Sequence, residues 1–319
     1  MSQIIPQTAG SLVARAAELA ELSEEDRRRF ALEAARDRDA AKLWALTEAH
    51  LTLHGAAGAH VSAHTLATYH YGVTAILKAW QGENLLRPSR NAGVMWVRAL
   101  EDKERSPRLS TGTVRSRLSG AKALYTALRW SGATEANPFQ DVRPARDTTP
   151  AWAKREAYEH HEVRRLEAHA YGANLFIVLL GAHAGLRVSE MTALRWEDID
   201  LGNGRLRVHN GKGGKAATVV LSRSLVTALE QTPSPERTGY VLPCRSRQSV
   251  YERLGTLCKT ARVEMRGVHA LRHAAGTRLR AETGDIALVA DHLRHATLET
   301  ARGYAKSNDA PRRKTVGEW

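Results

Sequence analysis

Two histidines and an arginine occupy one short basic stretch, "HALRHAAGTRLR", at residues 269–280. A helix would place His269 and His273 one turn apart on the same face, with Arg272 close by. Histidines at this spacing can bind zinc, but the metalloprotease pattern requires Glu after the first histidine, and Ala270 stands there. The metal interpretation is therefore weak, while a phosphate-binding patch and ordinary helix positions both stay open.

A glycine-rich stretch, "GKGGK" at 211–215, resembles half of a phosphate loop. A Walker A motif requires Ser or Thr after its lysine, and Gly213 follows Lys212, so an ATP site is not supported. Two short β-type runs flank the stretch, which predicts the tip of a hairpin. Such a tip can present Lys212 to a groove, although taken alone it is more often an ordinary flexible turn.

A third stretch, "GLRVSEMTALRWEDIDL" at 185–201, combines an arginine with an acidic residue. A helix beginning near Arg187 places Glu190 one turn away on the same side, where its carboxylate can orient the guanidinium toward an anion. In isolation such a pair is most often a surface ion pair of little energetic weight. Tyr304 in "ARGYA" is equally ambiguous by itself, because a lone tyrosine in a helix usually belongs to the core or its rim.

The charge of the chain indicates a polyanionic partner. Among 319 residues, 47 Lys and Arg against 34 Asp and Glu give a formal net charge of +13, with a hydrophobic content of 43% that is normal for a soluble globular protein. Basic residues are in excess in both 41–150 and 151–319, whereas acidic residues are in slight excess in 1–40. This distribution favours a nucleic acid or an anionic membrane surface that two domains contact.

Other sequence features disfavour a membrane protein or a disulfide framework. The longest apolar run, "LFIVLLGAHAGL", is too short for a membrane span and contains His183. We find neither a secretory signal nor an amphipathic stretch with a Lys and Arg face opposite Trp and Phe. The two cysteines, Cys244 and Cys258, form no close pair, which indicates a reducing compartment. We therefore expect a cytoplasmic protein without membrane contact.

Apolar spacing predicts two groups of helices and one hairpin. Prolines in the segment 138–153 disfavour helix and mark a linker between the groups. The expected fold is mainly α with a small antiparallel β-sheet, in two domains, with the second at 154–319. "SEED" at 23–26 reads as a capping box, and the remaining helices are expected at 62–80, 91–101, 111–131, 159–170, 173–184 and from Ser246 onward.

Together, the order and spacing of these motifs resemble those of the tyrosine recombinases, the group that includes Xer recombinases and phage integrases. The resemblance covers about residues 40–306 and is carried by "NPFQDVRP", "AGLRVSEMTALRWEDIDL", "GKGGK", "HALRH" and "LRHATLETARGYA". It implies a SAM-like helical core-binding domain at 41–137, a catalytic domain at 154–319, and an N-terminal helical extension at 1–40 with no family counterpart.

Residue by residue, the resemblance implies an active site that needs neither metal nor ATP, so no cofactor is expected. Arg187 matches the first arginine, and Glu190 matches the acidic residue that supports the site. The other matches are the hairpin lysine Lys212, the H-x-x-R residues His269 and Arg272, the second histidine His295 and the nucleophile Tyr304. The arginines would stabilise the negative charge on the phosphate in place of magnesium.

The same resemblance implies a reaction. Tyr304 would form a covalent 3′-phosphotyrosyl bond, Lys212 would protonate the departing 5′-oxygen, His269 would assist proton transfer at the tyrosine, and His295 would hydrogen-bond the phosphate. The family usually has Leu-Gly-His before the tyrosine, whereas this chain has "LRH" with Arg294. If that position requires a positive φ, arginine strains the turn by about 1 kcal/mol or somewhat more.

The expected partner is double-stranded DNA, bound by a homo-tetramer or by a hetero-tetramer with a second recombinase, and the expected location is the nucleoid in the cytoplasm. Two other functions use the same fold. One is a type IB topoisomerase-like nicking and closing enzyme, and the other is a DNA-binding protein that has lost catalysis. A membrane-surface protein would explain the charge but would bind liposomes, whereas a DNA-binding protein shows salt-sensitive DNA binding.

Overall fold

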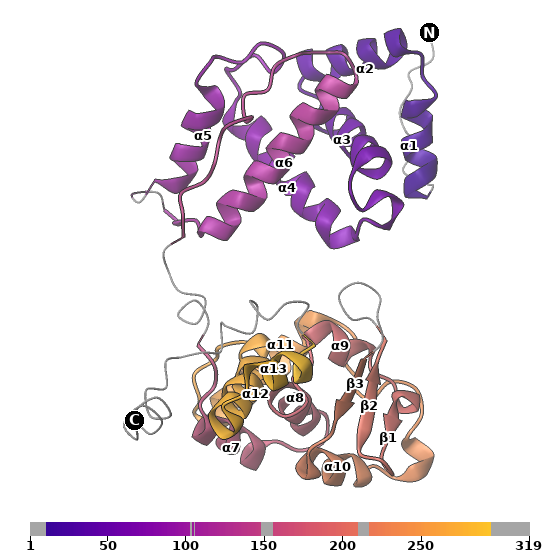
Figure 1. Cartoon of the computed structure of the whole chain (residues 1–319), viewed down its shortest axis with the longest axis vertical. Helices are drawn as coiled ribbons and strands as arrows, with labels where there is room; N and C mark the ends of the chain where they lie inside the picture. The colour runs from indigo at the N-terminus through magenta and orange to yellow at the C-terminus, as the bar shows by residue number, and fades with distance from the viewer. Residues whose placement is uncertain (1–10, 103, 105, 148–155, 210–216, 295–319) are drawn as a thin grey trace, which may run out of the picture. The chain divides into compact units, whose positions relative to one another are not determined.

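The computed structural model describes residues 11–102, 104, 106–147, 156–209 and 217–294. The chain divides into two compact units, Met1–Thr148 and Thr149–Trp319. Both are mainly helical, and the second also contains a three-stranded antiparallel sheet (Figure 1). The fold class expected from the sequence, mainly α with a small antiparallel sheet, is therefore confirmed.

The described part of the first unit is helical. Ser11, Ser23, Asp39, Ser62 and Ser110 each accept a hydrogen bond from a main-chain N–H in the first turn of the helix that follows, which sets where those helices begin. Ser23 is thus the expected helix cap, although its hydroxyl donates to the Asp26 carboxylate in place of a full capping box. The helices are α1 (Leu12–Ala20), α2 (Glu24–Arg36), α3 (Ala40–His54), the short 3₁₀ helix η1 (Gly58–His60), α4 (Ala63–Ala79), α5 (Ala92–Glu101) and α6 (Thr111–Trp130).

A single hydrophobic core joins all the α-helices of this unit, including α1 and α2 from the acidic N-terminal segment. Phe139, in the proline-containing segment after α6, is fully buried in the same core and stacks on Trp80. Tyr125 on α6 is also buried, and its hydroxyl donates to the Leu85 carbonyl at 2.9 Å. The chain just after α6 is therefore anchored to this unit by an aromatic side chain.

Two glycines allow α4 and α6 to approach closely where they cross (Figure 1). A β-carbon added at Gly120 would lie 2.4 Å from the Tyr69 carbonyl oxygen and 2.7 Å from Gly72 Cα. A β-carbon at Gly72 would lie 2.7 Å from the Arg117 carbonyl oxygen. These neighbours are main-chain atoms, so neither helix can accommodate a methyl group without moving.

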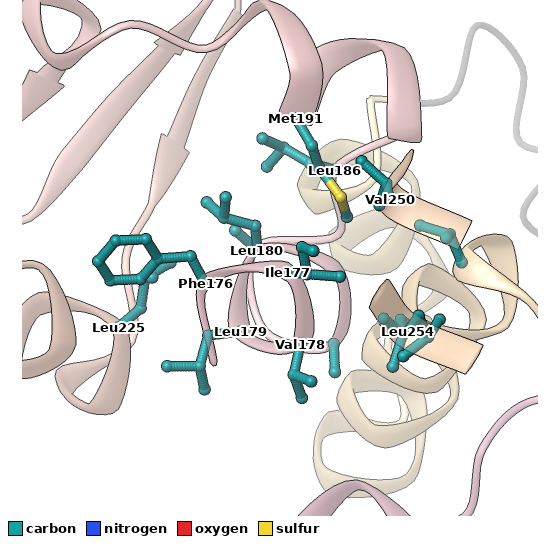
Figure 2. Packing of buried hydrophobic residues seen from close by; sticks show 14 of the residues in the cluster. Phe176, Ile177, Val178, Leu179, Leu180, Leu186, Met191, Leu225, Val250 and Leu254 are labelled. Atoms are coloured by element: carbon teal, nitrogen blue, oxygen red, sulfur yellow. The ribbon is translucent and has the colours of Figure 1, made fainter. Parts of the chain in front are cut away.

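In the second unit, an apolar helix occupies the centre. The helix α8 (Ala173–Ala182) is buried along nearly its whole length. Figure 2 shows its side chains pointing in several directions, with Phe176 toward Leu225 and Ile177 on another side. The remaining helices are α7 (His160–His169), α9 (Val188–Ala193), α10 (Arg223–Glu230), α11 (Arg247–Ala261), α12 (Val268–Thr283) and α13 (Ile286–His292), with the 3₁₀ turns η3 (Trp196–Asp198) and η4 (Ser234–Glu236).

The sheet of the second unit lies at one side of these helices (Figure 1). Its strands are β1 (Ile199–Asp200), β2 (Arg205–Val208) and β3 (Ala217–Val220), in the order β1-β2-β3 with antiparallel pairing. Leu206 pairs with Val219, and both are buried on the core face, as alternation in a half-buried strand requires. Strands β2 and β3 confirm the predicted hairpin, and its tip, which contains Lys212, lies outside the described residues.

Gly120→Ala is expected to destabilise the first unit, because the added methyl group overlaps main-chain atoms of α4. The free energy of unfolding should fall by about 1–3 kcal/mol, measured by urea or thermal denaturation. Gly112→Ala in the same helix is the control, because a β-carbon there would meet only Ser110 Oγ at 3.7 Å. That variant should be neutral or slightly stabilising, and equal effects of the two substitutions would show that the crossing is not tightly packed.

Candidate active site

The ion pair predicted at the start of α9 is present and mostly buried. Arg187 precedes the helix, and its main-chain N–H donates to Glu190 Oε2 at 2.8 Å. The Arg187 Nη1 donates to Glu190 Oε1 at 2.7 Å. The Glu190 side chain is only 2% exposed, whereas that of Arg187 is 31% exposed. The carboxylate therefore holds a guanidinium that still reaches the surface, so the pair is not an ordinary solvated surface pair.

A tight turn between α8 and α9 brings Arg187 to this position. Gly185 in the turn has a φ of +61°, and a β-carbon there would lie 2.4 Å from Leu293 Cδ2. Glycine adopts this conformation without strain, whereas a larger residue would be strained and would have to displace the buried Leu293 side chain. His183, at the end of α8, is held by Glu167 Oε1 at 2.9 Å and Ser222 Oγ at 2.8 Å. The turn is thus fixed by packing on one side and by a polar cluster on the other.

Arg272 on α12 lies behind this turn and is fully buried, with 1% of its surface exposed. Its guanidinium donates to two main-chain carbonyls, those of Gly185 and Leu293. The sequence predicted Arg272 as a phosphate-binding residue, and in this geometry it joins the turn before Arg187 to the end of α13. Close packing of α8 on α12 supports the arrangement, since a β-carbon at Gly181 would lie 2.6 Å from Leu271 Cβ.

His269, one turn before Arg272 on α12, lines a cavity together with Arg187. The cavity has a volume of about 670 Å³, and the described residues in its wall include Arg247, Arg266 and one carboxylate, Glu156. Arginines outnumber acids around it, which favours an anionic ligand. Arg266 is itself paired with Glu162 at 2.7 Å, so part of its charge is already compensated.

Arg294 also binds Glu190, and the sequence did not predict this contact. Burial alone would raise the pKa of Glu190, but the charge of Arg294 and the contacts from Arg187 hold that pKa below its usual value. Arg294 Nη2 donates to Glu190 Oε2 at 2.8 Å and to the Gly185 carbonyl at 3.1 Å. The backbone of Arg294 has a φ of +52°, the left-handed conformation that costs a non-glycine residue about 1 kcal/mol.

The departure "LRH" was visible in the sequence, where Arg294 was considered only as a source of backbone strain. The positive φ on which that expectation was conditional is present. What the sequence could not show is the destination of the side chain, because Glu190 lies 104 positions earlier in the chain. The contact could have been suspected only from knowing that Glu190 is buried and therefore needs a second cation besides Arg187.

The predicted site residues are therefore only partly brought together by the described structure. Arg187 and His269 line one cavity, with Glu190 and Arg272 packed behind it. Lys212, His295 and Tyr304 lie outside the described residues. His273 forms an edge-to-face contact with His269, with ring centroids 4.9 Å apart. Within the described part of the chain, no group of three or more His, Cys, Asp or Glu side chains is placed to hold a metal ion.

Two regions of the chain match one family. Residues 57–132 match the N-terminal SAM-like domain of the phage integrases, and residues 157–310 match the Phage integrase family. No described helix is long and apolar enough to cross a membrane.

Two curated relatives are tyrosine recombinases named XerC. The protein from Proteus mirabilis is 36% identical over 137 residues, which cover 38% of this chain and 43% of the relative. The protein from Xanthomonas campestris pv. campestris is 25% identical over 257 residues, covering 76% of this chain and 79% of the relative. The chain therefore spans less than half of the first relative and about four fifths of the second.

Two solved structures share the fold. A XerH recombinase in a post-cleavage complex with palindromic difH substrate aligns with a TM-score of 0.64 and 15% identity, over 97% of this chain and 95% of that chain. A lambda integrase tetramer bound to a Holliday junction aligns with a TM-score of 0.61 and 15% identity, over 76% of this chain and 72% of that chain. The domain matches, the curated relatives and the shared fold agree with the motifs read from the sequence, and the chain belongs to the phage integrase family as a tyrosine recombinase.

Proposed function

We propose that this chain is a site-specific DNA recombinase that cleaves and rejoins DNA through a covalent 3′-phosphotyrosyl bond at Tyr304, without metal or ATP. The observation that carries the proposal is the guanidinium of Arg187, held by the buried carboxylate of Glu190 and lining, with His269, a basic cavity of about 670 Å³. A preoriented guanidinium beside an imidazole suits a phosphodiester, because charge develops on the phosphate oxygens as a nucleophile attacks.

In the proposed reaction, the Tyr304 hydroxyl oxygen bonds to phosphorus and the bond from phosphorus to the 5′-oxygen breaks. His269 accepts the tyrosine proton, and Lys212 donates a proton to the departing 5′-oxygen. His295 donates a hydrogen bond to the phosphate. Because the phosphotyrosyl ester conserves the energy of the phosphodiester, a 5′-hydroxyl from another strand can reverse the steps and join new partners.

The proposed phosphate contacts of Arg187 and Arg272 rest on different observations. Arg187 is assigned to the phosphate because it lines the cavity and is oriented by Glu190. Arg272 is assigned on the resemblance and on its place one helical turn from His269. In the described geometry its guanidinium is engaged by the carbonyls of Gly185 and Leu293, so it also holds the wall of the cavity together.

Double-stranded DNA is the proposed partner, contacted by a core-binding domain at 41–137 and a catalytic domain at 154–319 that a linker at 138–153 joins. The +13 net charge supports this. A tetramer on DNA, of this chain alone or with a second recombinase, is supported by the lambda integrase tetramer that shares the fold. The protein would then act at the nucleoid in the cytoplasm.

Incubation with DNA in EDTA, followed by SDS, is expected to trap a covalent protein–DNA adduct that Tyr304→Phe abolishes. The duplex probe would be enriched from a random-sequence library by binding to the wild-type chain, and then nicked near its centre so that the cleaved 5′-end diffuses away. Loss of the adduct in the variant is expected because phenylalanine has no hydroxyl to attack phosphorus. The measurement is the fraction of labelled DNA that migrates with protein.

An equal adduct in Tyr304→Phe would show that another residue is the nucleophile. DNA binding without any adduct on the nicked probe would favour the inactive DNA-binding protein. Relaxation of supercoiled DNA with no joining between two probes would favour the topoisomerase-like enzyme.

Glu190→Gln is expected to lower both the stability and the cleavage rate, because the buried carboxylate loses its charge between two guanidiniums. The pKa of Glu190 is lowered in the folded state, so its contribution to stability is present above the ordinary carboxyl pKa and is lost as pH falls through the lowered pKa. At neutral pH the variant should lose roughly 2 kcal/mol of unfolding free energy. The difference from wild type should shrink below about pH 4.

Glu197→Gln is the matched control for this pH dependence. Glu197 also pairs with an arginine, Arg195, but its side chain is 61% exposed. The control should change stability little at any pH, measured by urea titration. A difference between Glu190→Gln and wild type that stays constant from neutral to acid pH would show that the ionised carboxylate is not what stabilises the site.

DNA affinity is expected to fall steeply with salt, since bound phosphates release counterions. A plot of log affinity against log salt concentration should have a slope of about −0.9 for each phosphate contacted. Anionic liposomes are the control surface. Binding to liposomes in place of DNA would support a membrane-surface protein.

A further inference from the structure

Arg294 ends α13 in a conformation that arginine rarely adopts. The last helical residue is His292, Leu293 caps the helix, and Arg294 follows with a φ of +52° while its N–H donates to the Asp291 carbonyl at 2.8 Å. Glycine would make the same turn without strain. The helix end therefore does not require arginine, and the backbone is strained by having it.

The side chain of Arg294 turns inward and is only 8% exposed. Its Nη2 donates to Glu190 Oε2 at 2.8 Å and to the Gly185 carbonyl at 3.1 Å, and its Nη1 donates to the His292 carbonyl at 3.1 Å. One guanidinium thus contacts the first turn of α9, the turn before it, and the end of α13. Among the described residues its buried Nε has no hydrogen-bond partner, which adds to the cost of burying the group.

These contacts complete the surroundings of the Glu190 carboxylate. Oε2 accepts from both the Arg187 main-chain N–H and Arg294 Nη2, and Oε1 accepts from Arg187 Nη1. Two cations on opposite oxygens restrict rotation of the carboxylate, which in turn fixes the guanidinium of Arg187. Burial and the charge of Arg187 lower the pKa of Arg294 below its usual value in spite of the opposing effect of Glu190. A guanidinium nevertheless remains charged at neutral pH.

Backbone strain and burial of the guanidinium both oppose stability, and glycine would end α13 without either, so the helix end alone does not account for arginine at this position. The contacts instead converge on the residue that orients the predicted phosphate-binding arginine. Residue 294 also directly precedes His295 in the chain, so its contacts join the cavity wall to the segment that carries the remaining predicted site residues.

We propose that Arg294 is a positioning residue for strand cleavage: by binding Glu190 and the Gly185 carbonyl, it fixes the guanidinium of Arg187 at the cavity. The inference rests on the proposed function, and it assigns a role to a residue at which the chain departs from its family. Arg294 itself acts through Glu190 and is not assigned a contact with DNA.

The test compares Arg294→Gly with wild type in single-turnover cleavage of the nicked, library-selected duplex. Glycine relieves the backbone strain but leaves the buried Glu190 with one cation fewer, so the variant should melt at a lower temperature than wild type, and cleavage is measured well below both melting temperatures. Its affinity for the duplex should stay within about threefold, while the cleavage rate at saturating protein falls about 10- to 100-fold, as for other residues that orient a group in an active site. Millimolar methylguanidinium should partly restore the rate by occupying the vacated space.

Arg262→Gly is the matched control. Arg262 ends α11 with the same φ of +52°, but its side chain is exposed. The substitution makes the same chemical and backbone change, so it should leave the cleavage rate unchanged and insensitive to methylguanidinium. The double variant Arg294→Gly with Glu190→Gln should cleave no more slowly than Glu190→Gln alone, because both changes act on the same carboxylate.

Three results would overturn the inference. The first is a wild-type rate in Arg294→Gly. The second is an Arg294→Gly rate that is slower than wild type and does not respond to methylguanidinium, together with a double variant in which the fold reductions of the two single variants multiply. The third is a wild-type protein that forms no Tyr304-dependent adduct, which would overturn the proposed function as well, whereas the first two leave that function intact.

Discussion

The candidate site depends on one buried carboxylate. Glu190 is nearly inaccessible to solvent and accepts hydrogen bonds from Arg187 and Arg294. A buried carboxylate without cations is strongly unfavourable, so the two arginines and the glutamate must assemble together. Three structural elements meet as a result: the start of α9, the turn before it, and the end of α13. The guanidinium that reaches the cavity is oriented by a group that never reaches it.

A main-chain carbonyl is the second fixed point of the site. The Gly185 carbonyl accepts from both Arg272 and Arg294, which come from α12 and from the end of α13. The turn can hold this carbonyl in place because Gly185 has a positive φ and packs on Leu293 with no room for a side chain. Close approach of α8 and α12 at Gly181 brings the guanidinium of Arg272 within reach. Gly185 therefore allows close packing on Leu293 and also places a carbonyl that two arginines can bind.

Both units use the same device to pack helices. In the first unit, α4 and α6 meet at Gly72 and Gly120, and in the second, α8 meets α12 at Gly181. Each contact gives up helix propensity for close packing, against main-chain atoms at Gly72 and Gly120 and against the Leu271 side chain at Gly181. The first unit also buries Phe139 from the segment after α6, so the beginning of the segment predicted as a linker, 138–153, is packed in this core. The extra helices α1 and α2 share that core and do not form a separate one.

Most of the local structure could be predicted from the amino-acid sequence. Apolar spacing placed α4, α5 and α6 within one or two residues, and the glycine-rich stretch between β-type runs predicted the hairpin of β2 and β3. These signals are local, because caps and periodicity depend on residues within one or two turns. The pairing of Arg187 with Glu190 was predictable for the same reason, since three positions separate them.

Which of these side chains meet, and how deeply they are buried, depends on how the helices pack. Arg294 finds Glu190 across 104 positions, and Arg272 reaches Gly185 across 87. Sequence spacing carries no information about such contacts, because they depend on the way α8, α12 and α13 pack. The sequence therefore specified the chemical groups and their helices, while packing determined that Glu190 is buried and that two arginines share it.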